Sequence, residues 1–181
     1  LYCGGDLISG RLLEPGHHCP DQAFITVTGG CIFHCRYCPV PNLKGRRKSV
    51  REIVAMVESV RHRIHAISIT SGVQESIEEE EAYVLEVVRH LSSVNLPVGG
   101  SIYPTDKPPD RLKALGVSEV KFNLEAATPE LFTEMCPGLA YDQILRVLDR
   151  SVEVFGKNRV FSNILIGLGE TEAELEACIK N

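Results

Sequence analysis

Three cysteines lie within eight residues of this sequence, at Cys31, Cys35 and Cys38. Thiolates are the usual ligands of iron–sulfur clusters, and three of them on one short loop can hold three corners of a cubane cluster. Because the loop contains no fourth cysteine, one iron of such a cluster is left open for an exogenous ligand. An open iron indicates catalysis.

Zinc is the alternative metal for these cysteines, with His34, Cys19 or His18 as the fourth ligand. Structural zinc sites usually combine two paired knuckles, and this sequence has one. We therefore favour the iron–sulfur cluster. A zinc-stabilised scaffold or binding protein is the non-enzyme alternative.

Composition and charge limit the class of protein and its partners. The 181 residues, 44% of them hydrophobic, suffice for one domain with a sizeable core. The net charge of -5 gives no electrostatic case for binding nucleic acid or an anionic membrane, so we expect small molecules or proteins as partners. Seven cysteines, an odd count, and the lack of a signal peptide or bilayer-spanning run predict a cytoplasmic protein with reduced thiols.

Short β-branched runs alternate with helical patterns along most of the chain, which is typical of βα units around a parallel sheet. We expect five strands, at residues 24–28, 66–70, 97–103, 119–124 and 159–166. The three cysteines directly follow the first strand, and loops at the carboxyl ends of parallel strands build active sites. We therefore divide the chain into an N-terminal extension, residues 1–23, and an α/β core domain, residues 24–181.

Three helix starts are marked by Ser or Thr followed three residues later by Glu, the capping box. They are Ser49/Glu52, Ser76/Glu79 and Thr171/Glu174. A further helical region begins at Thr128-Pro129-Glu130, is interrupted at Pro137-Gly138 and resumes to a stop at Gly156. Residues 78–81 are all Glu, and we interpret this run as the acidic first turn of a helix that complements the macrodipole.

The spacing C-x3-C-x2-C after the first strand, with the aromatic Tyr37 before the last cysteine, resembles that of the radical S-adenosylmethionine (SAM) superfamily. The resemblance covers nearly the whole chain from residue 24. It implies a partial (β/α)6 TIM-like barrel of parallel strands, incomplete at both ends in this chain. It also implies a [4Fe-4S] cluster whose open iron binds SAM and cleaves it reductively. The product is a 5'-deoxyadenosyl radical that abstracts hydrogen from a small or carrier-bound substrate.

The resemblance extends to the ends of later strands and assigns SAM contacts there. Ser71, Gly72 and Glu75 stand where the family often carries a Gly-Gly-Glu-like turn that receives the SAM amino group. Only one Gly is present, and Gly72 and Glu75 also fit a plain turn before a helix cap. On the fourth strand, Asn123 and Glu125 resemble the Asn-Leu-Asp/Glu element of the biotin synthase and lipoyl synthase branch, where the polar pair binds the ribose. Strand alternation puts both side chains on one face.

The end of the fifth strand carries a third element of the same branch. Residues 167–171 read Gly-Leu-Gly-Glu-Thr, which is typical at this place. The resemblance implies that Ile166 and Gly167, with the backbone by Tyr37, form the adenine slot. The glycines permit a close backbone approach.

Departures from this branch leave the reaction open. The strands that carry second-cluster cysteines in biotin synthases have none here, and Cys136-Pro137-Gly138 stands where the branch often reads Arg-Pro-Gly. Cys3, Cys19 and Cys136 are either ligands of an auxiliary iron–sulfur cluster or ordinary buried or free cysteines. Sulfur insertion, as in lipoyl and biotin synthases, is one candidate reaction. Methylation, mutase rearrangement and carbon–carbon bond formation are the alternatives.

A basic stretch, Lys44, Arg46, Arg47 and Lys48, follows the cysteine loop. We interpret it as a solvated loop; the alternative is a docking site for an acidic electron donor such as a flavodoxin or ferredoxin, or for an anionic substrate. The chain starts at Leu1 rather than Met, and its last twelve residues are typical of a helix that has barely started. We therefore expect it to be part of a longer protein.

Overall fold

The computed structural model describes residues 2–3, 6–7, 21–43 and 45–180. Its main element is a parallel sheet whose five strands follow one another in chain order. They are β3 (Gln22–Thr26), β4 (Ala66–Thr70), β5 (Val98–Ser101), β6 (Glu119–Lys121) and β7 (Val160–Phe161). A separate antiparallel pair consists of β1 (Tyr2–Cys3) and β2 (Asp6–Leu7). The predicted parallel α/β sheet of five strands is confirmed.

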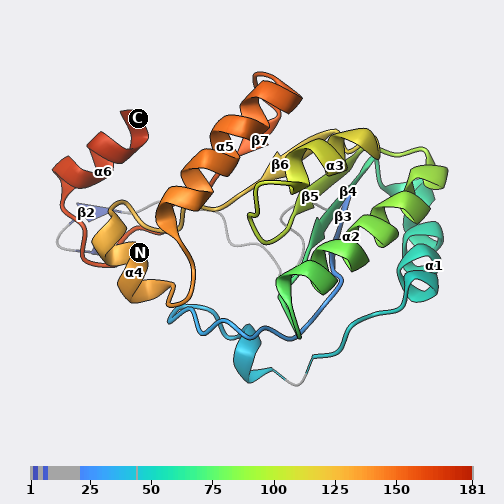
Figure 1. Ribbon diagram of the computed structural model, residues 1–181, viewed down its shortest axis with the longest axis horizontal. Coiled ribbons are helices and arrows are strands. Elements are labelled where there is room, and N and C mark those ends of the chain that lie inside the picture. The colour runs from blue at the N-terminus through green and yellow to red at the C-terminus, as the bar shows by residue number, and fades with distance from the viewer. Residues whose placement is uncertain (1, 4–5, 8–20, 44, 181) are drawn as a thin grey trace.

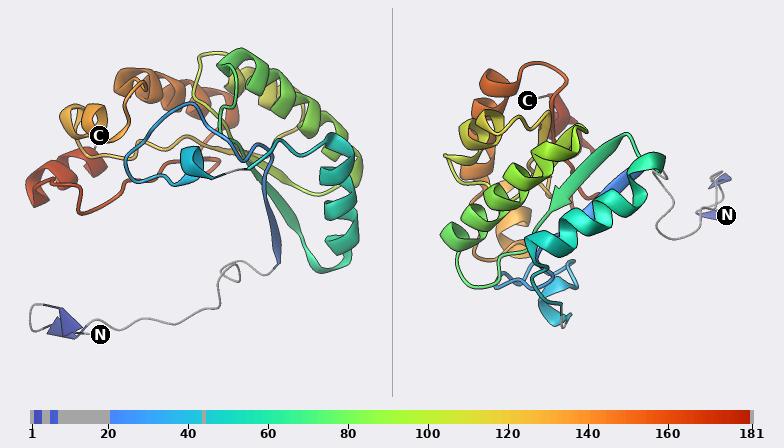
Figure 2. Two further views of the ribbon diagram at one scale, coloured as in Figure 1. Left: turned by 90° about the horizontal axis from the view of Figure 1, so that it is seen from below. Right: turned by 90° about the vertical axis from the view of Figure 1, so that its right-hand side faces the viewer.

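Helices connect these strands and lie along one side of the sheet, as Figures 1 and 2 show for α1, α2, α3 and α5. The helices are α1 (Val50–Val60), α2 (Ile77–Leu91), α3 (Pro108–Ala114), α4 (Pro129–Met135), α5 (Tyr141–Phe155) and α6 (Glu172–Lys180). Short 3-10 turns are η1 (Val40–Asn42), η2 (Arg61–Arg63) and η3 (Ser92–Val94). Sequential parallel strands with helices on one face are the arrangement of a partial (β/α) barrel.

The three predicted capping pairs lie at the starts of α1, α2 and α6. The Ser49 hydroxyl accepts from the Glu52 amide at 3.2 Å, and the Glu52 carboxylate accepts from the Ser49 amide at 2.8 Å. Thr171 and Glu174 make the same reciprocal pair, and Ser76 caps α2 through the Glu79 amide. Each pair satisfies amide groups that a helix start leaves without partners.

The hydrophobic core fills the space between the sheet and the helices. It is built from alternate strand residues and from one face of each helix, and includes Ile25, Val27, Ile67, Ile69, Ile53, Val57, Val84, Val87, Val88 and Leu91. The opposite face of the sheet carries mostly polar or small residues, including Gln22, Ser68, Thr70, Gly99, Ser101 and Lys121. Strand alternation therefore separates an apolar outer layer from a polar inner face.

Several element bounds differ from the sequence-based expectation, and β5 and β6 end two and three residues earlier than predicted. β3 begins at Gln22, two residues before the predicted start, and β7 is shorter than predicted, although Ile164 still bridges to Glu125. Helix α3 was not predicted. Its signals are Pro108 at the first helical position and Asp110 in the first turn, and both are also typical of turns.

The acidic run forms the first turn of α2, as predicted, but it is only partly solvated: Glu78 and Glu79 are exposed, whereas Glu80 and Glu81 are buried. Thr28 Oγ1 donates to Glu80 Oε1 at 2.6 Å, and Arg47 Nη2 lies 2.9 Å from Glu80 Oε2. The Ser71 hydroxyl also donates to Glu80. The buried carboxylate therefore joins the end of β3, the end of β4 and the segment before α1 to the N-terminus of α2.

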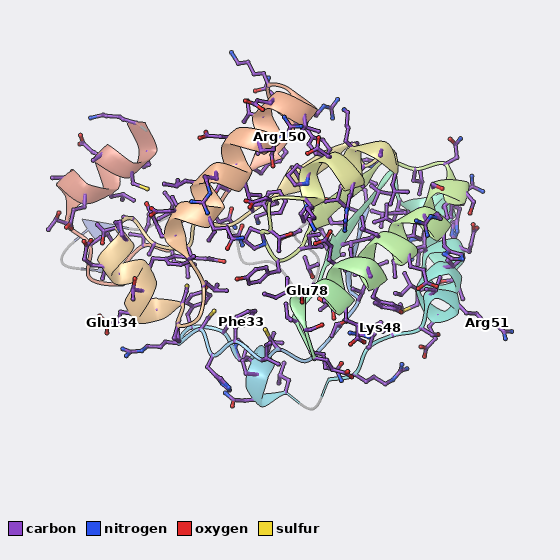
Figure 3. All side chains as sticks on the ribbon, viewed as in Figure 1. Phe33, Lys48, Arg51, Glu78, Glu134 and Arg150 are labelled. Carbon is purple, nitrogen blue, oxygen red and sulfur yellow. The ribbon has the colours of Figure 1, made fainter. Side chains whose placement is uncertain are left out.

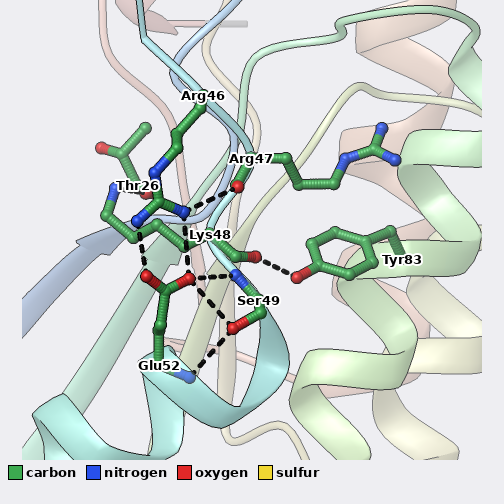
Figure 4. A network of polar contacts seen from close by, with 7 residues as sticks. All are labelled: Thr26, Arg46, Arg47, Lys48, Ser49, Glu52 and Tyr83. Atoms are coloured by element: carbon green, nitrogen blue, oxygen red, sulfur yellow. Dashed lines mark hydrogen bonds and ion pairs between the residues drawn. The ribbon is translucent and has the colours of Figure 1, made fainter.

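The side chains of the basic stretch also make contacts within the fold (Figure 4). Arg46 forms an ion pair with Glu52 at 2.5 Å, and the Lys48 ammonium donates to the Thr26 carbonyl at 2.6 Å. The Arg47 guanidinium stacks over the Tyr83 ring at 4.9 Å. The interpretation as a solvated loop holds for Arg46, whose side chain is 69% exposed, but not for Arg47, whose side chain is 23% exposed and binds the buried Glu80.

Glu80→Ala should destabilise the fold by about 2–4 kcal/mol, because Thr28 and the Arg47 guanidinium then lose a buried acceptor. Glu79→Ala is the matched control: Glu79 binds the same Arg47 at 2.7 Å but is exposed, so its loss should change stability far less. Urea denaturation of both variants measures the difference. Equal losses of stability in the two variants would show that burial of the Glu80 carboxylate does not determine its contribution to stability.

Candidate functional site

A cavity of about 330 Å³ lies at the carboxyl ends of the strands. All three cysteines of the loop line it, and all three are half-buried free thiols. Strand ends and loops supply the rest of the lining, including Thr70, Ser71, Gly72, Ser101, Tyr103, Asn123 and Glu125. The loop after β3 and the ends of β4, β5 and β6 therefore meet around one space.

Backbone hydrogen bonds hold the cysteine loop on both sides. The Ile32 amide donates to the Val73 carbonyl at 2.7 Å, which joins the loop to the end of β4. The Arg36 amide donates to the Met135 carbonyl at 2.8 Å, which joins it to the end of α4. The Arg36 side chain adds an ion pair at 2.6 Å to Glu134, which is labelled on α4 in Figure 3. These contacts position the loop that carries the thiols.

Gly72 permits the close approach of the cysteine loop to β4. A Cβ atom at this residue would lie 2.2 Å from the Gly30 carbonyl oxygen and 3.2 Å from Cys31 Cβ. Real Cβ contacts with backbone atoms are not this short, so any other residue would push the loop away. The role of Gly72 is therefore steric.

Cys136 closes one side of the site. Its Sγ lies 3.6 Å from the Tyr37 hydroxyl, and Cys35 packs against the buried cluster to which Cys136 belongs. The hydrogen bond to Cys136, followed by burial, holds the pKa of the Cys35 thiol well above its usual range. Burial, followed by the hydrogen bond to the Cys136 thiol, raises the pKa of the Tyr37 hydroxyl. Coordination to a metal would deprotonate the Cys35 thiol.

Asn123 and Glu125 point into the cavity from the strand end, as alternation predicted. Asn123 Oδ1 is buried and has no hydrogen-bond partner in the described part of the chain. Glu125 has a φ of 64°, a left-handed conformation that costs a non-glycine residue energy. Burial raises the pKa of its carboxyl, against the opposing effect of hydrogen bonds from Asn123 and Tyr37. An unsatisfied acceptor beside a strained, desolvated carboxylate indicates a ligand site.

The structure does not bring every predicted SAM contact to this cavity. Glu75 is exposed at the start of α2, and Ile166, at 74% exposure, and Gly167 lie outside the lining. Ser71 lines the cavity, but its hydroxyl is occupied by Glu80 and the Gly72 carbonyl. The Glu170 carboxylate accepts from the Gly167 amide at 2.6 Å, so this part of the Gly-Leu-Gly-Glu-Thr motif stabilises its own turn.

Sequence reasoning missed an aromatic pair at the cavity. Phe33 of the cysteine loop stacks on Tyr103 with ring centroids 5.1 Å apart, and both line the site. Aromatic residues at a loop and a strand end are the available signal, but spacing alone does not say that they meet. His34, a zinc candidate, is exposed and outside the lining. Cys19, His18 and the Cys3 side chain lie outside the described residues.

The thiols suit a [4Fe-4S] cluster in number and chemistry. Three free cysteines line the cavity, a glycine contact keeps their loop close to β4, and the same lining contains an acceptor without a partner at Asn123. This combination matches a cluster with one open iron and an exogenous ligand. Within the described residues, no three His, Cys, Asp or Glu side chains are grouped so that they could hold a single metal ion.

The structure thus combines a partial-barrel fold with three free cysteines that line a cavity at its strand ends. The radical SAM superfamily profile matches residues 25–180, and the chain belongs to that superfamily. This membership agrees with the resemblance in the cysteine spacing.

Individual relatives are distant and carry different activities in their names. A lipoyl synthase from Corynebacterium jeikeium is 25% identical over 170 residues, which cover 89% of this chain and 48% of the relative. A tRNA-2-methylthio-N(6)-dimethylallyladenosine synthase from Syntrophotalea carbinolica is 26% identical over 168 residues, which cover 84% and 38%. The chain thus spans about half the length, or less, of these curated relatives.

A solved structure with the same fold is that of the FeFe-hydrogenase maturase HydG from Carboxydothermus hydrogenoformans. It superposes with a TM-score of 0.73 at 24% identity and covers 87% of this chain and 38% of that one. This likeness supports the partial TIM-barrel fold. None of the helices that the structure describes has the length and apolar character needed to cross a bilayer.

Gly72→Ala should destabilise the chain by about 1–3 kcal/mol and lower the iron retained after reconstitution, because the new Cβ displaces the cysteine loop. Gly30→Ala is the matched control, since its Cβ would meet only the Gln74 side chain, at an ordinary 3.5 Å. Thermal unfolding and iron analysis compare the two. A Gly72 variant as stable and iron-rich as the Gly30 variant contradicts the steric role.

Glu125→Gln should stabilise the metal-free chain increasingly as the pH rises above 4.5, the ordinary pKa of the carboxyl. Because the folded-state pKa is raised, the folded chain binds this proton more tightly than the unfolded chain. The protonated Glu125 carboxyl stabilises the fold fully below the pKa that it has in the unfolded chain. This stabilisation is lost as the pH rises through its pKa in the folded chain, whereas Gln stays neutral at every pH. Denaturation curves from pH 4 to 8 measure the difference in unfolding free energy between the variant and the wild type. A difference that does not change with pH contradicts the prediction.

Proposed function

We propose that this chain uses a [4Fe-4S] cluster held by Cys31, Cys35 and Cys38 to cleave SAM reductively to a 5'-deoxyadenosyl radical, which abstracts hydrogen from a small or carrier-bound substrate. The observation that carries the proposal is that all three thiols line one cavity with Asn123 and Glu125. When bound, the cluster supplies the electron for the cleavage.

The chain's own residues bind and orient SAM. The unpartnered Asn123 Oδ1 and the Glu125 carboxylate accept hydrogen bonds from the ribose hydroxyls, which satisfies a buried acceptor that otherwise costs energy. The backbone of Ser71 and Gly72, which line the cavity, would bind the SAM amino group, since the Ser71 hydroxyl bonds to Glu80 and the Gly72 carbonyl. Stacked Phe33 and Tyr103 exclude water from the same space.

Three predicted SAM contacts carry less support from the geometry. Glu75 lies on the exposed side of its turn, so we assign it no contact with SAM and expect the backbone beside Gly72 to take that role. Ile166 and Gly167 stay predictions for the adenine slot, and the backbone by Tyr37 is the nearer wall of the cavity.

Sulfur insertion is the reaction we put first, because similarity to a lipoyl synthase supports the biotin and lipoyl synthase-like branch. Methylation, mutase rearrangement and carbon–carbon bond formation are the second choice. A flavodoxin or ferredoxin would supply the electron. The bound side chains of Arg46, Arg47 and Lys48 weaken the case for docking at that stretch. The free thiols and the cluster fit a cytoplasmic enzyme.

Anaerobic reconstitution of the full-length protein tests the proposal. We expect about four irons and four sulfides per chain, and 5'-deoxyadenosine from SAM in the presence of dithionite. Cys31→Ala, Cys35→Ala and Cys38→Ala should each abolish deoxyadenosine formation, because each removes a corner ligand. Cys178→Ala is the matched control: this half-buried free cysteine on α6 lies outside the cavity, so both readouts should survive. Zinc without iron, and no deoxyadenosine, would overturn the proposal.

Iron counting also tests the auxiliary cluster. About eight irons in the wild type, falling to four in a Cys3/Cys19/Cys136 triple alanine variant, would support a second cluster and sulfur insertion. Four irons in both would count against it. Because Cys136 packs beside Cys35, a Cys3/Cys19 double variant is needed to separate loss of the second cluster from damage to the first.

A further inference from the structure

A second cavity, of about 360 Å³, lies on the inner face of the sheet and adjoins the first. The two share Thr70, Ser101 and Asn123 in their linings. Gly99 leaves room for the second cavity, because a Cβ there would lie 3.3 Å from Glu119 Cγ and 3.6 Å from Ser68 Oγ. A molecule in this space would reach the proposed ribose-binding residue Asn123 directly.

Lys121 is the one Lys or Arg among the described residues that line either cavity. Its side chain is half-buried, and with the Asn163 amide oriented to satisfy both of its groups, Lys121 Nζ donates to Asn163 Oδ1 at 2.7 Å. It forms no ion pair within the described part of the chain and acts on Glu125 only through longer-range electrostatics. An ammonium group has three donors, so two remain for a ligand.

Hydroxyl groups continue the row from Lys121 across the sheet. Thr26 pairs with Thr70, and Thr70 pairs with Ser101. Gly100 pairs with Val120, so the next residues along the two strands, Ser101 and Lys121, are neighbours. Thr26 Oγ1 and Thr70 Oγ1 are 3.0 Å apart. Hydroxyl donors beside an ammonium group form a surface that complements an oxyanion.

Glu119 is the acidic group closest to Lys121 along β6, on the same face. It has its own cation, since Arg159 Nη1 lies 4.0 Å from Glu119 Oε2. Glu119 lines the same cavity as Lys121, but no ion pair joins the two among the described residues. The positive charge on the inner wall is left for a ligand.

We propose that the inner cavity binds a small substrate through an anionic group, a carboxylate or a phosphate, which is held by Lys121 and the adjoining Ser101 and Thr70 hydroxyls. The proposal rests on the proposed function and names the class of its substrate. Lys121 and Asn123 are one pleat apart, about 7 Å along the strand. The anionic group therefore lies several bonds from the carbon that the radical attacks.

Binding of two probe anions tests the site in the reconstituted full-length protein at low ionic strength. Inorganic phosphate and succinate are titrated by phosphorus and proton NMR line broadening, with succinamide as the neutral counterpart of succinate. We expect saturable binding of at least one anion and none of succinamide. Lys121→Met, which keeps the apolar stem, should weaken binding tenfold or more, because a charge-assisted hydrogen bond is lost. Lys121→Arg should retain it.

Lys157→Met is the matched control, since Lys157 is an exposed lysine outside both cavities, and it should bind as the wild type does. Whichever of the two anions binds more tightly distinguishes a carboxylate from a phosphate substrate. Lack of saturable binding of either anion, equal binding of succinamide, or unchanged affinity in a folded Lys121→Met variant would each overturn the proposal.

Saturating SAM is the last arm of the experiment. If SAM abolishes anion binding, Lys121 serves the carboxylate of SAM itself and the substrate site is wrong. Failure here is distinguishable from failure of the proposed function. If the protein holds four irons and forms deoxyadenosine but binds neither anion, only the proposed anionic substrate is wrong. If it binds an anion but holds no cluster, only the proposed radical chemistry is wrong.

Discussion

The buried carboxylate of Glu80 is the interaction on which the site depends. It accepts from Thr28, directly before the cysteine loop, and binds Arg47, directly after it. Thr28 and Arg47 also pair as an isolated antiparallel bridge. The loop that carries the three thiols is therefore closed at its base. Because the Ser71 hydroxyl binds the same carboxylate, the loop after β4 is fixed in the same frame.

The two layers of the fold divide stability from binding. The apolar layer between sheet and helices buries the large side chains, and a closely packed layer of this kind supplies most of the stabilising free energy. The inner face instead holds an acceptor without a partner at Asn123 and a left-handed residue at Glu125. Both cost stability in the free chain, and both are what a preorganised ligand site requires. The outer layer offsets this cost.

Much of the fold follows from local sequence signals, and the site follows only in part. The strands and capping boxes could be predicted because alternation and caps act over a few residues. Burial of Glu80 could not, since an acidic first turn suits the helix dipole whether it is solvated or paired, and the partners Thr28 and Arg47 are distant in sequence. The resemblance assigned SAM contacts to Glu75 and Ile166, and both side chains are exposed and outside the cavity lining. A motif gives a residue's place in the chain, but it does not fix the direction of a side chain in a loop.

Strand β6 and its continuation set the geometry between the two cavities. Lys121, Asn123 and Glu125 occupy alternate positions, so all three face inward at steps of about 7 Å. A shift of one residue in the pairing of β6 with β5 would turn all three toward the apolar layer, where Val120, Phe122 and Leu124 now lie. Burial of those apolar residues therefore fixes the register. The spacing between the proposed radical source and the proposed substrate anchor is thus a consequence of core packing.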